Sequence, residues 1–111
     1  VGPAVARVLV AVSDLMLSSR VVEGLKAAGH EPVLKPSVPA EAPEGAALLV
    51  CDLDAVDADQ AVALGLPTLG FYSHTDVETR KRALEAGFGM VVPRSRMVRE
   101  LQSLVDGLID A

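Results

Sequence analysis

Aromatic residues and cysteine are scarce in this sequence. Its 111 residues include no Trp, one Tyr, two Phe and one Cys. Few side chains are therefore available for stacking nucleic-acid bases, and the core must be built from Val, Leu and Ala. The single cysteine, Cys51, excludes an internal disulfide and agrees with a reducing cytoplasm, the location that we expect. Its surroundings predict a small buried hydrophobe.

Basic residues and long apolar runs are also in short supply. Ten Lys and Arg face 15 Asp and Glu, giving a net charge of -5, which argues against a general nucleic-acid binder because phosphate contacts need an excess of cations. No apolar run approaches the roughly 20 residues of a membrane span, so we expect no membrane partner. Catalytic triads, zinc-ligand spacings and glycine-rich phosphate loops are missing too, and we expect no enzyme. With 50% hydrophobic residues, residues 1–111 predict one domain with one core.

The stretch that is most informative is AALLVCDLD, residues 46–54. A short apolar run that ends abruptly in acids is typical of a strand buried on both faces. Asp52 would then lie at the carboxyl end of a central strand. Ligands of open parallel sheets usually bind at that edge.

Four more short apolar stretches alternate with helical patterns. We expect strands at 7–12, 31–34, 67–72 and 89–92, and helices at 15–28, 55–65, 77–86 and from 96 onward. Asp14 should cap the first helix, the pair Thr75 and Glu78 the third, and Ser95 the last. Leu15, Ser18, Val22 and Leu25 should form the buried face of the first helix, whereas Arg20 should face outward.

This alternation predicts an α/β fold, a flavodoxin-like doubly wound sheet of five parallel strands in the order 2-1-3-4-5. The stretch 35–45 (KPSVPAEAPEG) lies where a second helix would be expected. Its three prolines, Pro36, Pro39 and Pro43, disfavour a helix because each removes a donor and clashes with the preceding turn. We therefore expect that helix to be shortened or lost.

Polar residues gather where the predicted strands end. Asp14, Asp52, Asp54, Ser73 and His74 should all lie at the carboxyl edge, and the strand order brings Asp14 beside Asp52. Two or three carboxylates there could bind Mg²⁺, a cation that prefers oxygen ligands. Helix capping or hydrogen bonding to nearby backbone is the alternative role of each acid.

The ordered segments RVLVAVSD, AAGHEPV, LLVCDLD, GFYSH, ALEAG and VVPRS resemble the receiver domain of two-component response regulators, the phosphorelay signal-transduction modules. The resemblance covers about residues 7–109. In that family two acids after the first strand and an Asp ending the third bind Mg²⁺, and the latter Asp is phosphorylated. The resemblance makes Asp52 the phosphoacceptor and places Asp54 where a backbone carbonyl meets the metal. Ser73 matches the hydroxyl that ends the fourth strand.

Other positions depart from the family. The acid pair falls on Val12 and Ser13, and Asp14 could substitute only if the turn were rearranged. The lysine after the fifth strand falls on Arg94, or on Pro93 with a one-residue slip, and Arg lacks the compact ammonium. With one firm carboxylate, Mg²⁺ would bind weakly. The resemblance therefore predicts a degenerate receiver, or pseudo-receiver; the alternative is a true receiver phosphorylated on Asp52.

Basic residues concentrate late in the chain. Between 80 and 99 lie Arg80, Lys81, Arg82, Arg94, Arg96 and Arg99, and in receiver-like proteins this region meets partners or a second copy. The stretch predicts a protein-binding face for an acidic partner or a homodimer. A nucleic acid contacted locally and a solvated helix surface are the alternatives. A further hypothesis is a small-molecule domain that uses the crevice around Asp14, Asp52 and His74; a more distant one is an enzyme with His74 as base.

Overall fold

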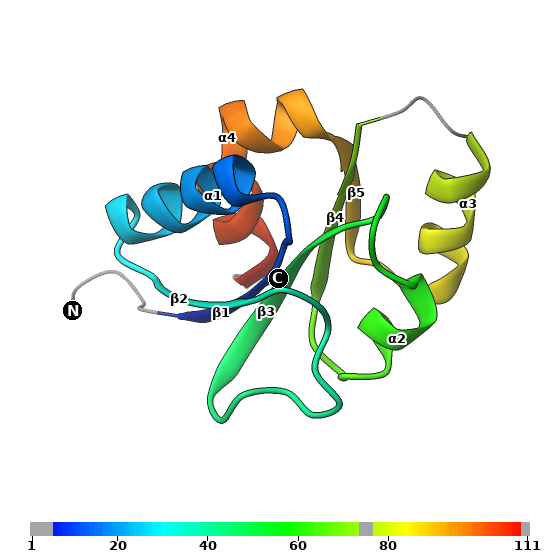
Figure 1. The fold of residues 1–111 in the computed structure, drawn as a ribbon, viewed down its shortest axis with the longest axis horizontal. Coiled ribbons are helices and arrows are strands. Elements are labelled where there is room, and N and C mark those ends of the chain that lie inside the picture. The colour runs from blue at the N-terminus through cyan, green and yellow to red at the C-terminus, as the bar shows by residue number, and fades with distance from the viewer. Residues whose placement is uncertain (1–5, 74–76, 110–111) are drawn as a thin grey trace.

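The sheet has five strands, all parallel, in the computed structural model, which describes residues 6–73 and 77–109. The strands are β1 (Arg7–Ala11), β2 (Glu31–Lys35), β3 (Ala46–Asp52), β4 (Thr68–Tyr72) and β5 (Met90–Pro93). Their order across the sheet is β2-β1-β3-β4-β5, as predicted (Figure 1). β3 therefore lies between β1 and β4, at the centre, and β2 is an edge strand.

Helices cover both faces of this sheet. They are α1 (Leu15–Ala27), α2 (Ala58–Val62), α3 (Val77–Ala86) and α4 (Arg94–Ile109). α1 and α4 lie together on one face, and α2 and α3 lie on the other (Figure 1). In the described part of the chain, no helix is long and apolar enough to cross a membrane.

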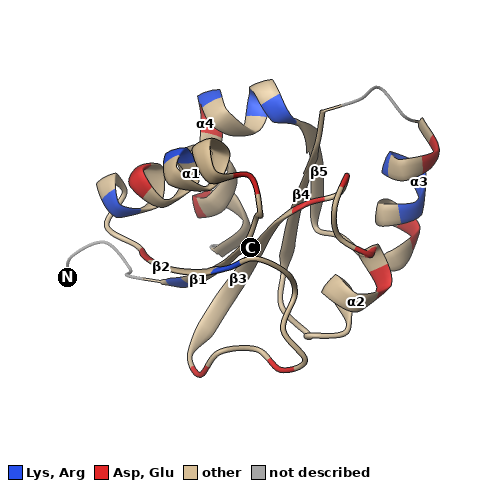
Figure 2. Cartoon of the chain, viewed as in Figure 1, with Lys and Arg blue, Asp and Glu red and all other residues tan. Residues whose placement is uncertain are grey.

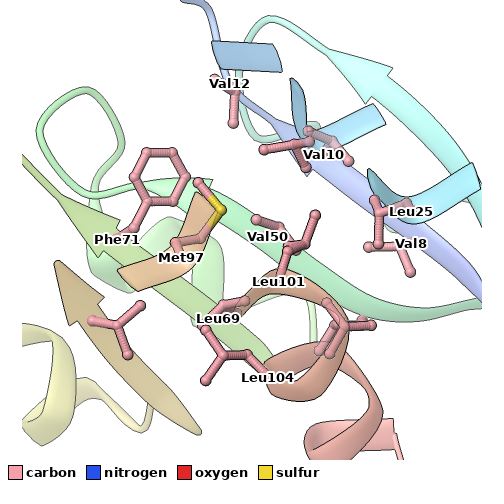
Figure 3. Packing of buried hydrophobic residues seen from close by; sticks show 14 of the residues in the cluster. Val8, Val10, Val12, Leu25, Val50, Leu69, Phe71, Met97, Leu101 and Leu104 are labelled. Carbon is pink, nitrogen blue, oxygen red and sulfur yellow. The ribbon is translucent and has the colours of Figure 1, made fainter. Parts of the chain in front are cut away.

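The larger of two hydrophobic clusters fills the space between the sheet and the pair α1 and α4. Figure 3 shows Met97 of α4 beside the ring of Phe71 from β4, with Val50 of β3 close by. All three are fully or almost fully buried. Alternate residues of β3 point the other way, so that Leu49 and Cys51 join the second cluster under α2 and α3. Burial on both faces explains why β3 has an unbroken apolar sequence.

No helix forms between β2 and β3, all of whose connecting residues are described. Residues 36–45, which carry the three prolines, form bends and turns, and Val38 from this loop packs against the second cluster. The predicted loss of a helix at this position is confirmed, together with the strand order and fold class.

The buried face of α1 differs from the predicted one. Leu17, Ser18, Val21 and Leu25 are buried, whereas Leu15 is 81% exposed and Val22 is only partly buried. Both stripes have helical spacing and share Ser18 and Leu25. Periodicity could not choose between them, because the choice depends on how α1 lies on the sheet.

Two other helices start at unexpected residues. α2 spans only five residues. It begins at Ala58 because the Asp57 side chain accepts a hydrogen bond from the Asp59 N–H and caps the helix there. α4 begins at Arg94, directly after β5. Ser95, predicted as its cap, thus lies inside the first turn.

Candidate functional site at the carboxyl edge of the sheet

Four polar residues follow the ends of four adjacent strands. Ala11 pairs with Cys51, Asp52 with Phe71, and Tyr72 with Pro93. This register sets Asp14, Asp52, Ser73 and Arg94 in a row along the carboxyl edge, in the order β1, β3, β4, β5. The sequence placed Asp14, Asp52, Asp54, Ser73 and His74 at this edge, and the strand order and register agree for the first four, whereas His74 lies outside the described residues.

Asp52 and Asp54 hold the turn that leaves β3. The Asp52 Oδ1 atom accepts a hydrogen bond of 2.9 Å from the backbone N–H of Asp54, and its carbonyl accepts from the N–H groups of Ala55 and Val56. The Asp54 Oδ2 atom accepts from the backbone N–H of Ser73 at 2.8 Å. The Asp54 carboxylate thus ties the β3 turn to the end of β4.

Several influences combine to raise the pKa of Asp52. Partial burial is the largest, because it disfavours the charged carboxylate, and the negative charges of Asp54 and Asp14 add to it. The hydrogen bond from the Asp54 N–H and the positive charge of Arg94 act in the opposite direction. The charges of Asp14 and Arg94 therefore both act on the Asp52 carboxylate.

Cys51, the neighbour of Asp52, is fully buried. Burial, followed by the charge of Asp52, raises the pKa of its thiol to about 12. Since the thiolate is the reactive form, this cysteine is inert at neutral pH. The predicted role as a small buried hydrophobe fits this environment.

The donor set at this edge does not fit a carboxylate-built Mg²⁺ site. Across residues 6–73 and 77–109, no group of three or more His, Cys, Asp or Glu side chains could hold a metal ion. Asp14 uses its Oδ1 atom to accept the Leu17 N–H at 2.9 Å and so caps α1, as predicted. Val12, at one position of the family's acid pair, is 3% exposed and belongs to the core. Mg²⁺ binding by Asp14, Asp52 and Asp54 remains a prediction.

A groove opens beside this row, between α1 and the start of α4. Ser73 and Arg94 line it, and Arg20 reaches it from α1. The sequence placed Arg20 on an outward face and gave it no role, because only the packing of α1 against α4 brings it to the edge. No motif in the sequence signals this neighbourhood.

The late basic residues are divided between the two faces of the sheet. Figure 2 shows basic positions on α3 and on the first half of α4. Arg80 and Lys81 border a hollow with Val77 and Leu84, whereas Arg82 faces another hollow with Asp57 and Asp59. Arg96 and Arg99 each pair with Glu100, at 3.4 Å.

Of the two histidines, His30 lies within the described residues and His74 does not. His74, the candidate base, lies outside the described residues, as does Thr75 of the predicted capping box. His30 has a buried ring whose Nδ1 accepts the Ala6 N–H at 3.2 Å, and its Nε2 lies 3.0 Å from Asp106 Oδ1. The sequence gave no hint of this pair, whose members lie 76 positions apart.

Several solved structures with a similar fold are receiver domains. A CheY-like response regulator receiver domain from Methanospirillum hungatei superposes with a TM-score of 0.80 at 16% identity, covering 96% of this chain and 95% of that one. The HemR receiver domain from Leptospira biflexa gives 0.80 at 19%, with 96% and 95% covered. The ChxR receiver domain from Chlamydia trachomatis gives 0.74 at 19%, with 96% and 98% covered. No family model and no curated protein matches the sequence.

The fold is thus the CheY-like, flavodoxin-like fold of response-regulator receivers, over nearly the whole chain. At these identities the likeness concerns the fold, and function must be argued from the residues of this chain.

Proposed function

We propose that residues 1–111 form one receiver-like regulatory module of a two-component type of signalling system, acting by protein–protein interaction in the cytoplasm. In this proposal the module is not an enzyme and is not efficiently phosphorylated. The observation that carries the proposal is the composition of the carboxyl edge. Asp52 stands where a phosphoacceptor would be, but Val12 is a core residue and Asp14 is engaged as a helix cap.

The chemistry of acceptor phosphorylation explains why these two positions matter. Transfer of a phosphoryl group to a carboxylate depends on cations that neutralise the charge on the transferred oxygens. With the acid pair replaced, Arg94 is the one cation among the described residues whose charge lowers the pKa of Asp52. Such a site should accept phosphoryl groups slowly and hold Mg²⁺ weakly.

The test is incubation with Mg²⁺ and a small phosphodonor such as acetyl phosphate, followed by intact-mass measurement. We expect little or no phosphoryl adduct under conditions that fully label an active receiver run in parallel. Asp52→Asn gives the baseline, and Asp54→Asn is the matched control because its amide oxygen can still accept the Ser73 N–H. A stoichiometric adduct that Asp52→Asn abolishes would establish the true-receiver alternative, with Ser73 and Arg94 as its phosphate contacts.

The partner surface in this proposal is the α3–β5–α4 face. On α3, Val77 is 74% exposed and Leu84 47% exposed, and Arg80 and Lys81 lie between them in one hollow. An apolar stripe interrupted by cations suits an acidic partner with apolar side chains, or a second copy of the chain. Arg82, Arg96 and Arg99, the other basic residues predicted for this face, lie outside the α3 hollow, with Arg82 beside Asp57 and Asp59 and the other two paired with Glu100.

Light scattering and crosslinking would test the homodimer. If α3 is the contact, Leu84→Glu should shift the population to monomer, whereas Leu34→Glu, at an exposed position on β2, should not. A monomer at all concentrations would remove the homodimer and leave an acidic partner as the proposal.

A further inference from the structure

We propose that the groove between α1 and the start of α4 binds a nucleotide, through the arginines that surround it. The groove lies beside the phosphoacceptor row and shares Ser73 and Arg94 with it, but the inference requires neither phosphorylation of Asp52 nor a protein partner. The groove encloses about 690 Å³, which is within the range of roughly 300–1,000 Å³ usual for small-molecule sites. The groove is open to solvent, and its volume leaves room for a molecule larger than a single inorganic anion.

The charge of the groove is opposite to that of the protein. Arg20, Arg94 and Arg99 line it, and none of its described lining residues is acidic, although the chain carries a net charge of -5. Three guanidinium groups around one hollow repel one another, and an anion placed among them relieves that repulsion. The groove is thus a local positive potential on an acidic molecule.

These arginines are free to bind. Within the described residues, Arg20 and Arg94 form no ion pair. In the same part of the chain, Arg99 pairs only with Glu100, and the two side chains are 71% and 38% exposed, respectively. An exposed pair of this kind contributes little and is easily exchanged for another anion. The cations also come from two helices, α1 and α4, so an anion can be held from two sides.

Phosphate is the anion that this set of donors suits best. A guanidinium presents a planar fork of N–H groups that matches two phosphate oxygens at once. Ser73 and Ser95, which also line the groove, add hydroxyl donors. A phosphate group would therefore find both charge and hydrogen bonds here.

The remaining lining explains why we assign a nucleotide and not free phosphate. Tyr72, Pro93 and Val98 provide apolar surface in the same groove. An aromatic ring and aliphatic groups next to arginines suit a molecule with a flat ring at one end and phosphates at the other. ADP is the probe that we choose.

The packing of α1 against α4 fixes this arrangement. A side chain added at Gly24 of α1 would meet the Leu101 side chain of α4 at 2.7 Å, so the two helices approach closely at this point. α1 also contacts α4 and β2. Arg20, one helical turn before Gly24, is therefore held on the same side as Arg94 and Arg99.

The experiment is titration of the protein with ADP, adenosine and inorganic phosphate, followed by calorimetry and by amide NMR shifts. We expect saturable ADP binding that weakens with added salt, with adenosine and phosphate each at least about tenfold weaker. Arg20→Gln and Arg94→Gln should each weaken ADP about tenfold, the usual order for one charge-assisted hydrogen bond. Lys26→Gln, six residues further along α1 and exposed, removes the same charge and should change nothing.

Four results would overturn the proposal. They are no saturable ADP binding, unchanged binding in both arginine variants, an equal loss in Lys26→Gln, and inorganic phosphate binding as tightly as ADP. A Glu-rich peptide that displaces ADP with higher affinity would assign the groove to an acidic protein partner instead. Thermal melts establish that each variant is folded, and Asp52→Asn should keep ADP binding, which separates this proposal from the function of Asp52.

Discussion

Folding disfavours the charged form of the Asp52 carboxyl group and so raises its pKa. Its partial burial and the acids Asp54 and Asp14 favour the neutral carboxyl, and only Arg94 and one N–H oppose them. A raised pKa in the folded state means that the stabilising contribution is fully present below the ordinary carboxyl pKa. It is lost as the pH rises through the raised value. At neutral pH the Asp52 carboxylate therefore weakens the fold.

Asp52→Asn should accordingly stabilise the protein at pH 7, by roughly 1 kcal/mol or less, the usual scale for a partly exposed position. The amide oxygen can still accept the Asp54 N–H, so the turn is kept. The gain should shrink as the pH falls through the raised pKa of Asp52 and should be absent below about 4, where the carboxyl is protonated in the unfolded chain as well. Urea unfolding at several pH values measures it.

Glu23→Gln is the matched control, because Glu23 is exposed on α1 and should show no such trend. A variant Asp52→Asn that is less stable than the parent at pH 7 would contradict this account of the Asp52 charge.

The same residue shows what the sequence can and cannot predict. Asp52 was placed correctly at a strand end because a short apolar run followed by an acid has few alternatives. Its raised pKa comes first from partial burial, with Asp54 and Asp14 adding to it and Arg94 opposing it. How deeply the carboxyl is buried depends on the packing of neighbouring elements, which the order of residues does not state.

Among the elements, β4 and α4 depend in opposite ways on glycine. A side chain added at Gly70 of β4 would meet the Phe88 ring at 2.7 Å and Leu53 at 2.9 Å. Gly107, near the end of α4, has nothing within 4 Å of an added Cβ. One glycine allows close packing, and the other only adds flexibility to a helix.

Gly70→Ala should destabilise the protein by roughly 1–3 kcal/mol, because the added methyl group overpacks a filled core. Gly107→Ala should stabilise it by about 0.5–1 kcal/mol, the difference in helix propensity. Chemical denaturation of the two variants beside the parent measures both. Equal effects of the same sign would show that local packing is not what separates these two sites.

At the scale of strands and helices, the sequence patterns predicted which segments form each element, but not which face of α1 is buried. Leu17 and Val21 form the buried stripe of α1, not Leu15 and Val22. Large apolar residues at positions 15, 16, 17, 21, 22 and 25 permit more than one stripe. The position of Arg20 in the groove follows from the same rotation, which is why the sequence missed it.

Across the whole molecule, His30 and Asp106 join the start of β2 to the end of α4. The Ala6 N–H can only donate, so Nδ1 of His30 accepts and the proton of the neutral ring is on Nε2, facing Asp106. The His30 side chain is 4% exposed, and that of Asp106 is 45% exposed. A buried donor therefore depends on one partly exposed acceptor.

Asp106→Ala should cost about 1–2 kcal/mol, because it leaves the buried Nε2–H without its partner. Asp106→Asn keeps an acceptor oxygen at the same place and should cost less than half as much. Thermal or urea unfolding distinguishes the two variants. If both were as stable as the parent, the contact would be a surface contact without structural weight.

The two strands joined by the loop without a helix, β2 and β3, differ in how deeply they are buried. β2 has no fully buried residue, whereas four consecutive residues of β3 are buried. β1 lies between them and is buried along most of its length. We therefore expect β2 to unfold locally more often than β3, without disturbing the segment that ends at Asp52. The edge of the sheet at β2 is thus less protected by burial than its centre at β3.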